Sequence, residues 1–221
     1  MYNKSDIELK VAEFLLQIKA IKLQPNNPFT WASGWKSPIY CDNRITLSHP
    51  QVRTFIRQKL AQAIQEEFGS VDVIAGVATA GIPQGVLVAQ ELGLPFIYVR
   101  AKAKEHGTGS LIEGEVVEGQ RVMVIEDLIS TGKSSLQAVE ALRAAGLSVA
   151  GLAAIFTYGF EKADENFAAA KCRYITLSNY SALIDYAAEH SIIAKSDMEL
   201  LSKWRLNPSE WGQNQTSNSQ S

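Results

Sequence analysis

The chain has 221 residues, a formal net charge of −2 and an apolar fraction of 46%. This length favours one large domain or a domain with a small appendage, and the charge balance gives no reason to expect a nucleic-acid surface. The sequence contains no apolar run of membrane-spanning length, its first ten residues lack a secretory signal, and two cysteines are too few for a disulfide framework. We therefore expect a cytoplasmic protein with reduced cysteines.

The N-terminal third contains two helical patterns separated by an aromatic stretch. Apolar residues between Ile7 and Ile18 recur at helical spacing, and a second helix is predicted from Ser48 to Phe68, ended by Gly69. Residues 26–47 are rich in aromatic and turn-forming residues and have no helical period. They favour strands with a turn at 32–34.

From residue 71 onward, strand patterns alternate with helical patterns. Strands are predicted at 71–77, 95–99, 122–125, 148–157 and 174–177, and the last two helices end near Trp204. This succession predicts a mostly parallel α/β sheet flanked by helices, in which ligands bind beyond the carboxyl ends of the strands. Residues 209–221 are expected to form a polar, disordered tail.

The segment at 121–135, RVMVIEDLISTGKSS, combines features that suit a ribose 5-phosphate. A buried strand at 122–125 is followed by Glu126 and Asp127, then by small and hydroxyl residues around Gly132, and then by a helix. Helix N-termini attract phosphates because their first N–H groups are unpaired. Two adjacent carboxylates can accept hydrogen bonds from a sugar diol, whereas an ordinary capped helix leaves this acidic pair unexplained.

Two nucleotide-binding motifs are disfavoured. A phosphate loop of the ATPase type needs a glycine five positions before Gly132, where Asp127 stands and would repel a triphosphate. The turn at 78–81 follows a strand and contains small residues, but Gly76 and Gly81 do not have dinucleotide-fingerprint spacing. This turn is interpreted either as a plain strand-to-helix connection or as a backbone anion site.

Residues 101–115 are predicted to form a polar, glycine-bearing loop, and the stretch RAKAKEHGTGS, which begins at Arg100, has a cationic pattern. Arg100, Lys102, Lys104 and His106 occupy alternate positions, so an extended chain would direct all four to one side. A long glycine-bearing loop in a compact domain is typical of a lid or binding loop. Its charges suit a pyrophosphate, although a solvated basic loop is the alternative.

These motifs together resemble the orotate-using members of the type I phosphoribosyltransferase family. VMVIEDLISTGKSS resembles the family's motif for phosphoribosyl pyrophosphate (PRPP), and RAKAKEHG resembles its catalytic loop. WASGWKSPIYCDNR resembles the N-terminal substrate region, and IAGVATAGIP the pyrophosphate loop. The resemblance covers about residues 5–208. It implies a type I phosphoribosyltransferase fold with an N-terminal helix and substrate-binding hood at 1–47, a core at 48–208 and the tail at 209–221.

The resemblance also implies a set of site residues. Lys104, His106 and Asp127 would be catalytic, with Lys104 and His106 reaching into the partner's site of a homodimer. The residues implied in PRPP binding are Arg100, Lys104, His106, Glu126, Asp127, Leu128, Ile129, Ser130, Thr131, Gly132, Lys133 and Ser134. The residues implied in orotate binding are Ser130, Lys36 and Arg44. Mg²⁺ is implied as the cofactor, held mainly by PRPP rather than by side chains.

The sequence departs from the family pattern at three places. Ala101 and Ala32 stand where some members have lysine, which makes Lys102 and Lys36 the candidate replacements. Some members have an arginine near the end of the strand that here reads IFTYGF, for the carboxylate of orotate. Arg44 is the candidate substitute, and a salt bridge between Arg44 and Asp42 is the equal alternative.

The implied reaction transfers the 5-phosphoribosyl group of PRPP to orotate, giving orotidine 5'-monophosphate and pyrophosphate in pyrimidine (UMP) biosynthesis. A purine phosphoribosyltransferase is a competing interpretation, because it would share residues 121–135 but lack the SGWKSP segment. A non-catalytic PRPP sensor is the second alternative, and the cationic loop disfavours it.

Overall fold

The computed structural model describes residues 4–31, 34–102 and 111–211. Within these residues six strands form one sheet in the order β10-β9-β8-β5-β6-β7. Their bounds are β5 Val73–Val77, β6 Phe96–Val99, β7 Ile112–Glu113, β8 Arg121–Ile129, β9 Ser148–Thr157 and β10 Tyr174–Asn179. Neighbouring strands are parallel except β6 and β7. The predicted mostly parallel α/β architecture is confirmed.

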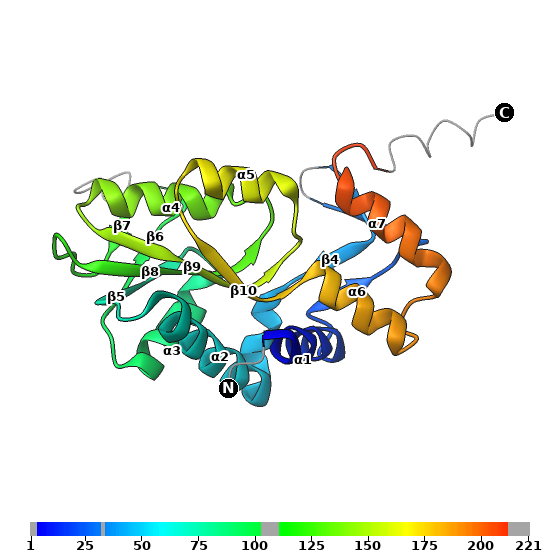
Figure 1. Ribbon diagram of the computed structural model, residues 1–221, viewed down its shortest axis with the longest axis horizontal. Helices are drawn as coiled ribbons and strands as arrows, with labels where there is room; N and C mark the ends of the chain where they lie inside the picture. Colours follow the sequence, from blue (N-terminus) through cyan, green and yellow to red (C-terminus); the bar gives the residue numbers. More distant parts are fainter. Residues whose placement is uncertain (1–3, 32–33, 103–110, 212–221) are drawn as a thin grey trace.

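Helices cover both faces of the sheet (Figure 1). Helices α2 (Pro50–Phe68) and α3 (Gly81–Leu92) lie on one face, and α4 (Lys133–Ala144) and α5 (Glu161–Ala169) lie on the other. Successive strand residues point to opposite faces, so Met123 packs in the first hydrophobic cluster while Val122 and Val124 pack in the second. Burial on both faces explains why these strands read as continuous apolar runs.

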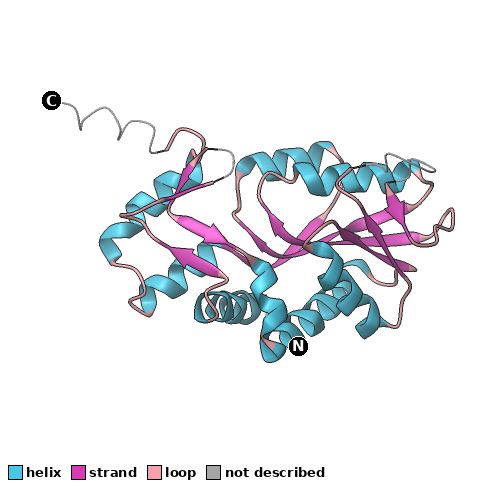
Figure 2. Ribbon diagram, turned by 180° about the vertical axis from the view of Figure 1, so that it is seen from behind, coloured by secondary structure: helices cyan, strands magenta, loops and turns pink. Residues whose placement is uncertain are grey.

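A smaller layer stands at the β10 side of the sheet (Figure 2). It combines α1 (Lys4–Gln17), the antiparallel pairs β1–β4 (Ile21–Leu23 with Ile39–Cys41) and β2–β3 (Phe29–Thr30 with Lys36–Ser37), and the helices α6 (Tyr180–Glu189) and α7 (Met198–Leu206). Trp31 and Trp204 join the two ends of the chain, with ring centroids 5.7 Å apart. We call the four strands β1, β2, β3 and β4 together the hood.

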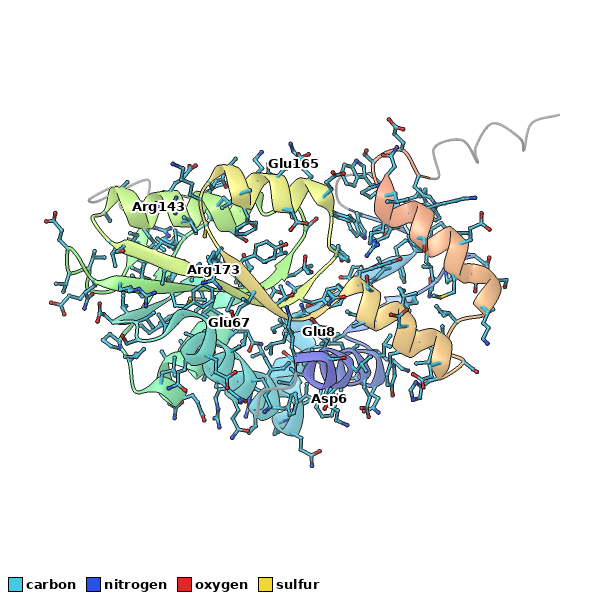
Figure 3. The ribbon with its side chains drawn as sticks, viewed as in Figure 1. Asp6, Glu8, Glu67, Arg143, Glu165 and Arg173 are labelled. Atoms are coloured by element: carbon cyan, nitrogen blue, oxygen red, sulfur yellow. The ribbon has the colours of Figure 1, made fainter. Side chains whose placement is uncertain are left out.

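Polar contacts hold this layer and the helices to the core (Figure 3). Ser178 Oγ of β10 donates to the backbone oxygen of Glu8 in α1 at 2.8 Å. Arg173, just before β10, lies 3.2 Å from Glu67 near the end of α2 and also stacks over Phe68. None of the helices in the described segments has the length and apolarity needed to cross a bilayer.

The structure corrects several predicted boundaries. Residues Asn43–Ser48 form a 3-10 helix rather than a strand, because the Asp42 carboxylate accepts the Arg44 N–H and turns the chain. Helix α2 begins at Pro50, after His49 rather than at Ser48. The predicted loop at 101–115 contains the edge strand β7. Strand β8 continues to Ile129 instead of ending at Ile125, because β9 offers it a longer partner.

Candidate functional site

The acidic pair lies where β8 extends past its pairing with β5 but is still paired with β9. Pairing with β5 ends at Gly76 and Ile125, whereas pairing with β9 continues to Ile129 and Thr157. Glu126 and Asp127 therefore lie beyond the carboxyl end of β5, in the position where parallel α/β sheets bind ligands. At these residues β8 is paired with β9 along one edge and is not paired with β5 along the other.

The turn before α3 packs directly on this opening. A side-chain carbon added to Gly81 would lie 2.5 Å from the backbone oxygen of Ile125 and 3.3 Å from Cα of Glu126. Only glycine permits this approach. Residues 78–80, which include a cis Ala78–Thr79 peptide bond, are thereby held against the acidic pair.

A chain of hydrogen bonds through buried residues also fixes the backbone at Asp127. Asn43 Nδ2 donates to the backbone oxygen of Asp127 at 2.7 Å. Thr46 Oγ1 donates to the backbone oxygen of Asn43 at 2.6 Å, and Gln84 Nε2 donates to Thr46 Oγ1 at 3.0 Å. Asn43, Thr46 and Gln84 are all buried. Helix α3, the chain after the hood and β8 are thus joined at the acidic pair.

Burial controls the charge of the two carboxylates. Glu126 is 6% exposed, and its pKa lies well above the usual range because of burial and then because of the negative charge of Asp127. Burial also raises the pKa of Asp127. Glu126 accepts hydrogen bonds from the Asp127 N–H at 3.0 Å and from Ser135 Oγ at 3.3 Å. Two adjacent acids with raised pKa values are typical of a functional site.

The loop after β8 presents backbone donors. Gly132 has a φ of 76° and precedes the first turn of α4, and in the described chain no side chain caps that helix. Asn166 of α5 holds the loop by donating from Nδ2 to the backbone oxygen of Thr131 at 2.9 Å. The N–H groups of the first turn are therefore available to an anion, as the sequence predicts.

A cavity of about 610 Å³ opens on the β5–β6 side of this loop. Ala78, Arg100, Lys102 and Ser134 line it, together with one carboxylate, Glu140. Arg100 follows β6, and its Nη1 lies 3.7 Å from Glu113 Oε1. We call this the Arg100 cavity.

A second cavity, of about 320 Å³, opens between the hood and the core. Its walls are Thr30, Trp31, Tyr40 and Cys41 from the hood and Leu128, Ser130 and Tyr158 from the core. Three aromatic rings give it the apolar flat walls that suit a planar ring. We call this the aromatic cavity. The segment 128–134, which directly follows the acidic pair, contributes Ser130 to the aromatic cavity and Ser134 to the Arg100 cavity.

The other candidates for orotate binding lie near the aromatic cavity. Lys36 Nζ donates to Thr30 Oγ1 at 2.8 Å, which places its charge beside a residue of the cavity wall. Arg44 makes a bidentate pair with Asp42, with contacts of 2.6 and 2.9 Å. The salt-bridge alternative for Arg44 is therefore present, and the role of either cation in orotate binding stays a prediction.

Some predicted residues fall outside the described part of the chain. Lys104, His106 and Ala32 belong to this group. Ala101 and Lys102 are described and exposed, directly after Arg100.

Several residues of the site were missed at the level of sequence. They are Asn43, Ser135 and Trp31, because no spacing rule in the sequence connects a residue near position 40 with one near 127. Tyr158 does carry a signal, because it directly follows a predicted strand, where ligand-facing residues collect.

Metal-binding groups are sparse here. Among the described residues no set of three histidine, cysteine or acidic side chains could hold a metal ion. Glu126 and Asp127 supply two carboxylates, which matches the way Mg²⁺ binds through one or two carboxylates together with substrate phosphates.

Comparison with known proteins gives concordant results. A family described as "Phosphoribosyl transferase domain" matches residues 46–190. An orotate phosphoribosyltransferase of Phocaeicola vulgatus is 57% identical over 205 residues, covering 93% of this chain and 97% of that protein. The structure of orotate phosphoribosyltransferase from Aeropyrum pernix superposes with a TM-score of 0.72 at 27% identity, covering 83% of this chain and 99% of that one.

A second similar structure contains PRPP. It is the orotate phosphoribosyltransferase of Mycobacterium tuberculosis in complex with PRPP, with a TM-score of 0.63 at 26% identity, covering 80% of this chain and 98% of that chain. The domain match spans more than half of the chain, and the Phocaeicola relative is matched almost end to end. This chain belongs to the orotate phosphoribosyltransferase family.

Proposed function

We propose that this chain transfers the 5-phosphoribosyl group of PRPP to N1 of orotate and releases pyrophosphate. One observation carries the proposal: the segment that follows Glu126 and Asp127 contributes Ser130 to a cavity with aromatic walls and Ser134 to a cavity that Arg100 and Lys102 also line. A ribose over the acidic pair would have a planar base on one side and a pyrophosphate on the other.

That arrangement suits a displacement at C1 of the ribose. The bond from C1 to the pyrophosphate oxygen breaks as the bond from orotate N1 forms on the opposite face, so C1 is inverted. The proton of orotate N1 is released to the departing pyrophosphate or to solvent. Negative charge grows on the departing pyrophosphate, and Arg100 is the described cation that stabilises it. Arg100 would then exchange its contact with Glu113 for the pyrophosphate.

The acidic pair stabilises the positive charge that forms on the ribose during the reaction. Ionised Glu126 and Asp127 accept hydrogen bonds from the ribose hydroxyls and favour the positive charge that develops on the ring. Their burial removes competing water and so strengthens these interactions. The uncapped N-terminus of α4, with Ser130–Ser134, holds the 5-phosphate. The reaction requires no nucleophilic side chain.

We also propose that Mg²⁺ arrives with PRPP. The described donors fit this idea, because Glu126 and Asp127 offer too few ligands for an all-protein magnesium site but enough to orient a substrate-held ion. Bound Mg²⁺ would neutralise negative charge on the pyrophosphate as it leaves.

Lys104 and His106 are proposed to complete the site from the second subunit of a homodimer. Their alternation with Arg100 in the sequence supports a shared cationic face. An unperturbed histidine titrates near neutrality, so His106 is suited to supply a proton or a charge to the pyrophosphate. Loop closure would exclude the water that otherwise hydrolyses PRPP.

A cytoplasmic location is proposed on the chemistry of the cysteines. Cys41 and Cys172 are both unpaired thiols, as expected in a reducing compartment.

The test is an absorbance assay of orotate consumption with PRPP and Mg²⁺. Orotate turnover, with adenine, hypoxanthine and guanine inert, is the expected result. Purine turnover without orotate turnover would favour the purine alternative. PRPP binding without turnover of any base would favour a non-catalytic sensor.

A further inference from the structure

Tyr158 occupies an unusual place in the aromatic cavity. It directly follows β9, is 3% exposed and lines the cavity. Its ring is surrounded by other rings: Trp31 at 5.3 Å, Phe160 at 5.3 Å, and Trp204 at 5.7 Å between centroids. Trp204, which is fully buried on α7, contacts both Trp31 and Tyr158. Rings from the N-terminal and the C-terminal parts of the chain therefore hold the tyrosine ring in place.

The hydroxyl of Tyr158 is the exception in this packed cluster. The hydrogen bonds found within the described residues include none from this hydroxyl, whereas Tyr180, in the same cluster, donates to the backbone oxygen of Leu201 at 3.1 Å. The fully buried side-chain atoms that lack a hydrogen bond among the described residues do not include this oxygen, so it stays open toward the cavity that the side chain lines. Such a group, facing a cavity, is suited to an acceptor on a ligand.

The protonation state of Tyr158 favours donation. Burial, then the nearby Cys41 and Asp127, raise its pKa well above the ordinary value for tyrosine. The phenol therefore keeps its proton at neutral pH, when a base with carbonyl or carboxylate oxygens would enter.

We propose that the Tyr158 hydroxyl donates a hydrogen bond to an oxygen of the pyrimidine substrate and so selects that base and positions it. This inference rests on the proposed function and deepens it. The ring wall of Trp31, Phe160 and Trp204 holds the donor in place, and Ser130 lies on the same cavity. A site built around a donor discriminates against bases without a matching acceptor, because the donor is then left unpaired.

The test is Tyr158→Phe, which removes one oxygen and keeps the packed ring. The KM for orotate should rise about 10- to 100-fold, the scale of one hydrogen bond to a charged or polar ligand, while the KM for PRPP stays within about twofold. Thermal stability should not fall, because the hydroxyl has no partner in the described chain to lose.

Tyr180→Phe is the matched control. It removes a hydroxyl from the same ring cluster, but one that bonds to Leu201 and does not line the cavity. It should lower stability and leave both KM values unchanged.

The outcomes separate this inference from the function on which it rests. An unchanged KM for orotate in Tyr158→Phe, with an active wild type, would overturn the role of the hydroxyl and leave the function standing. Equal rises in both KM values together with lost stability would mean a packing role only. An inactive wild type with orotate would overturn the function, and this inference with it.

Discussion

Replacement of Gly132 by alanine probes the phosphate loop directly. Gly132 has a φ of 76°, and an added side-chain carbon would lie 2.6 Å from Cε2 of Phe167. Phe167 is 2% exposed, and its ring also packs against Tyr174, with centroids 4.4 Å apart. The left-handed conformation costs an alanine about 1–2 kcal/mol, and overpacking a rigid ring costs about 1–3 kcal/mol more. We expect Gly132→Ala to lose about 2–5 kcal/mol of unfolding free energy.

Gly93→Ala is the matched control for the conformational part of that loss. Gly93 ends α3 with a φ of 67° and has open space around the added carbon. It should lose only about 1–2 kcal/mol. Urea unfolding of the three proteins at one protein concentration measures the difference. Equal losses in both variants would refute the close contact between Gly132 and Phe167.

Gly132→Ala also has a functional consequence. Relief of the contact must move the loop or the ring, and the loop carries the N–H groups proposed for the 5-phosphate. We expect PRPP affinity, measured by calorimetry, to fall more than about tenfold, whereas Gly93→Ala should bind normally. Normal PRPP affinity in a folded Gly132→Ala protein would place the phosphate elsewhere.

The remaining predictions concern the acidic pair and the shared site. Asp127→Asn should lower kcat by about 100-fold or more while the circular dichroism spectrum is kept, and wild-type rates would remove the ribose assignment. Because the pKa values of Glu126 and Asp127 are raised, kcat/KM for PRPP should begin to fall, as the pH is lowered, at a pH above the ordinary carboxyl range. In Asp127→Asn, the acid limb of the pH profile of kcat/KM should move to lower pH, because the charge of Asp127 contributes to the raised pKa of Glu126. An acid limb at the wild-type pH would contradict this coupling. The raised folded pKa of Glu126 also means that wild-type stability falls as the pH rises from the unfolded pKa through the folded pKa. Glu126→Gln cannot ionise, so it should gain stability relative to wild type above the unfolded pKa, with the full gain above the folded pKa. Mixing inactive Lys104→Ala and Asp127→Asn proteins should restore about a quarter of wild-type activity if two subunits share each site, and no recovery in verified mixed dimers would refute sharing.

The alternation of strands and helices was predictable because it depends on local periodicity. Continuous apolar runs such as Val122–Ile125 identify strands buried on both faces, and glycines at 69, 93 and 146 end helices in positive-φ conformations. The acidic pair and the loop around Gly132 were predictable for a related reason. Their residues are contiguous, so spacing alone places them together.

The remaining features depend on contacts between distant segments. The length of β8 is set by its partner β9, which no pattern within 121–129 reveals. The 3-10 helix after the hood depends on one hydrogen bond, which the backbone N–H of Arg44 donates to the carboxylate of Asp42. The ring cluster at the aromatic cavity joins Trp31, Tyr158 and Trp204 across more than 170 positions of sequence, so only the folded chain brings them together.

The most direct test of the central claim is a crystal structure of the chain with PRPP, Mg²⁺ and a non-reacting analogue of orotate. We predict the ribose hydroxyls within hydrogen-bond reach of Glu126 and Asp127, the pyrophosphate in the Arg100 cavity, and the pyrimidine ring in the aromatic cavity beside Tyr158. A pyrimidine bound away from the aromatic cavity, or a ribose that leaves the acidic pair untouched, would contradict the account.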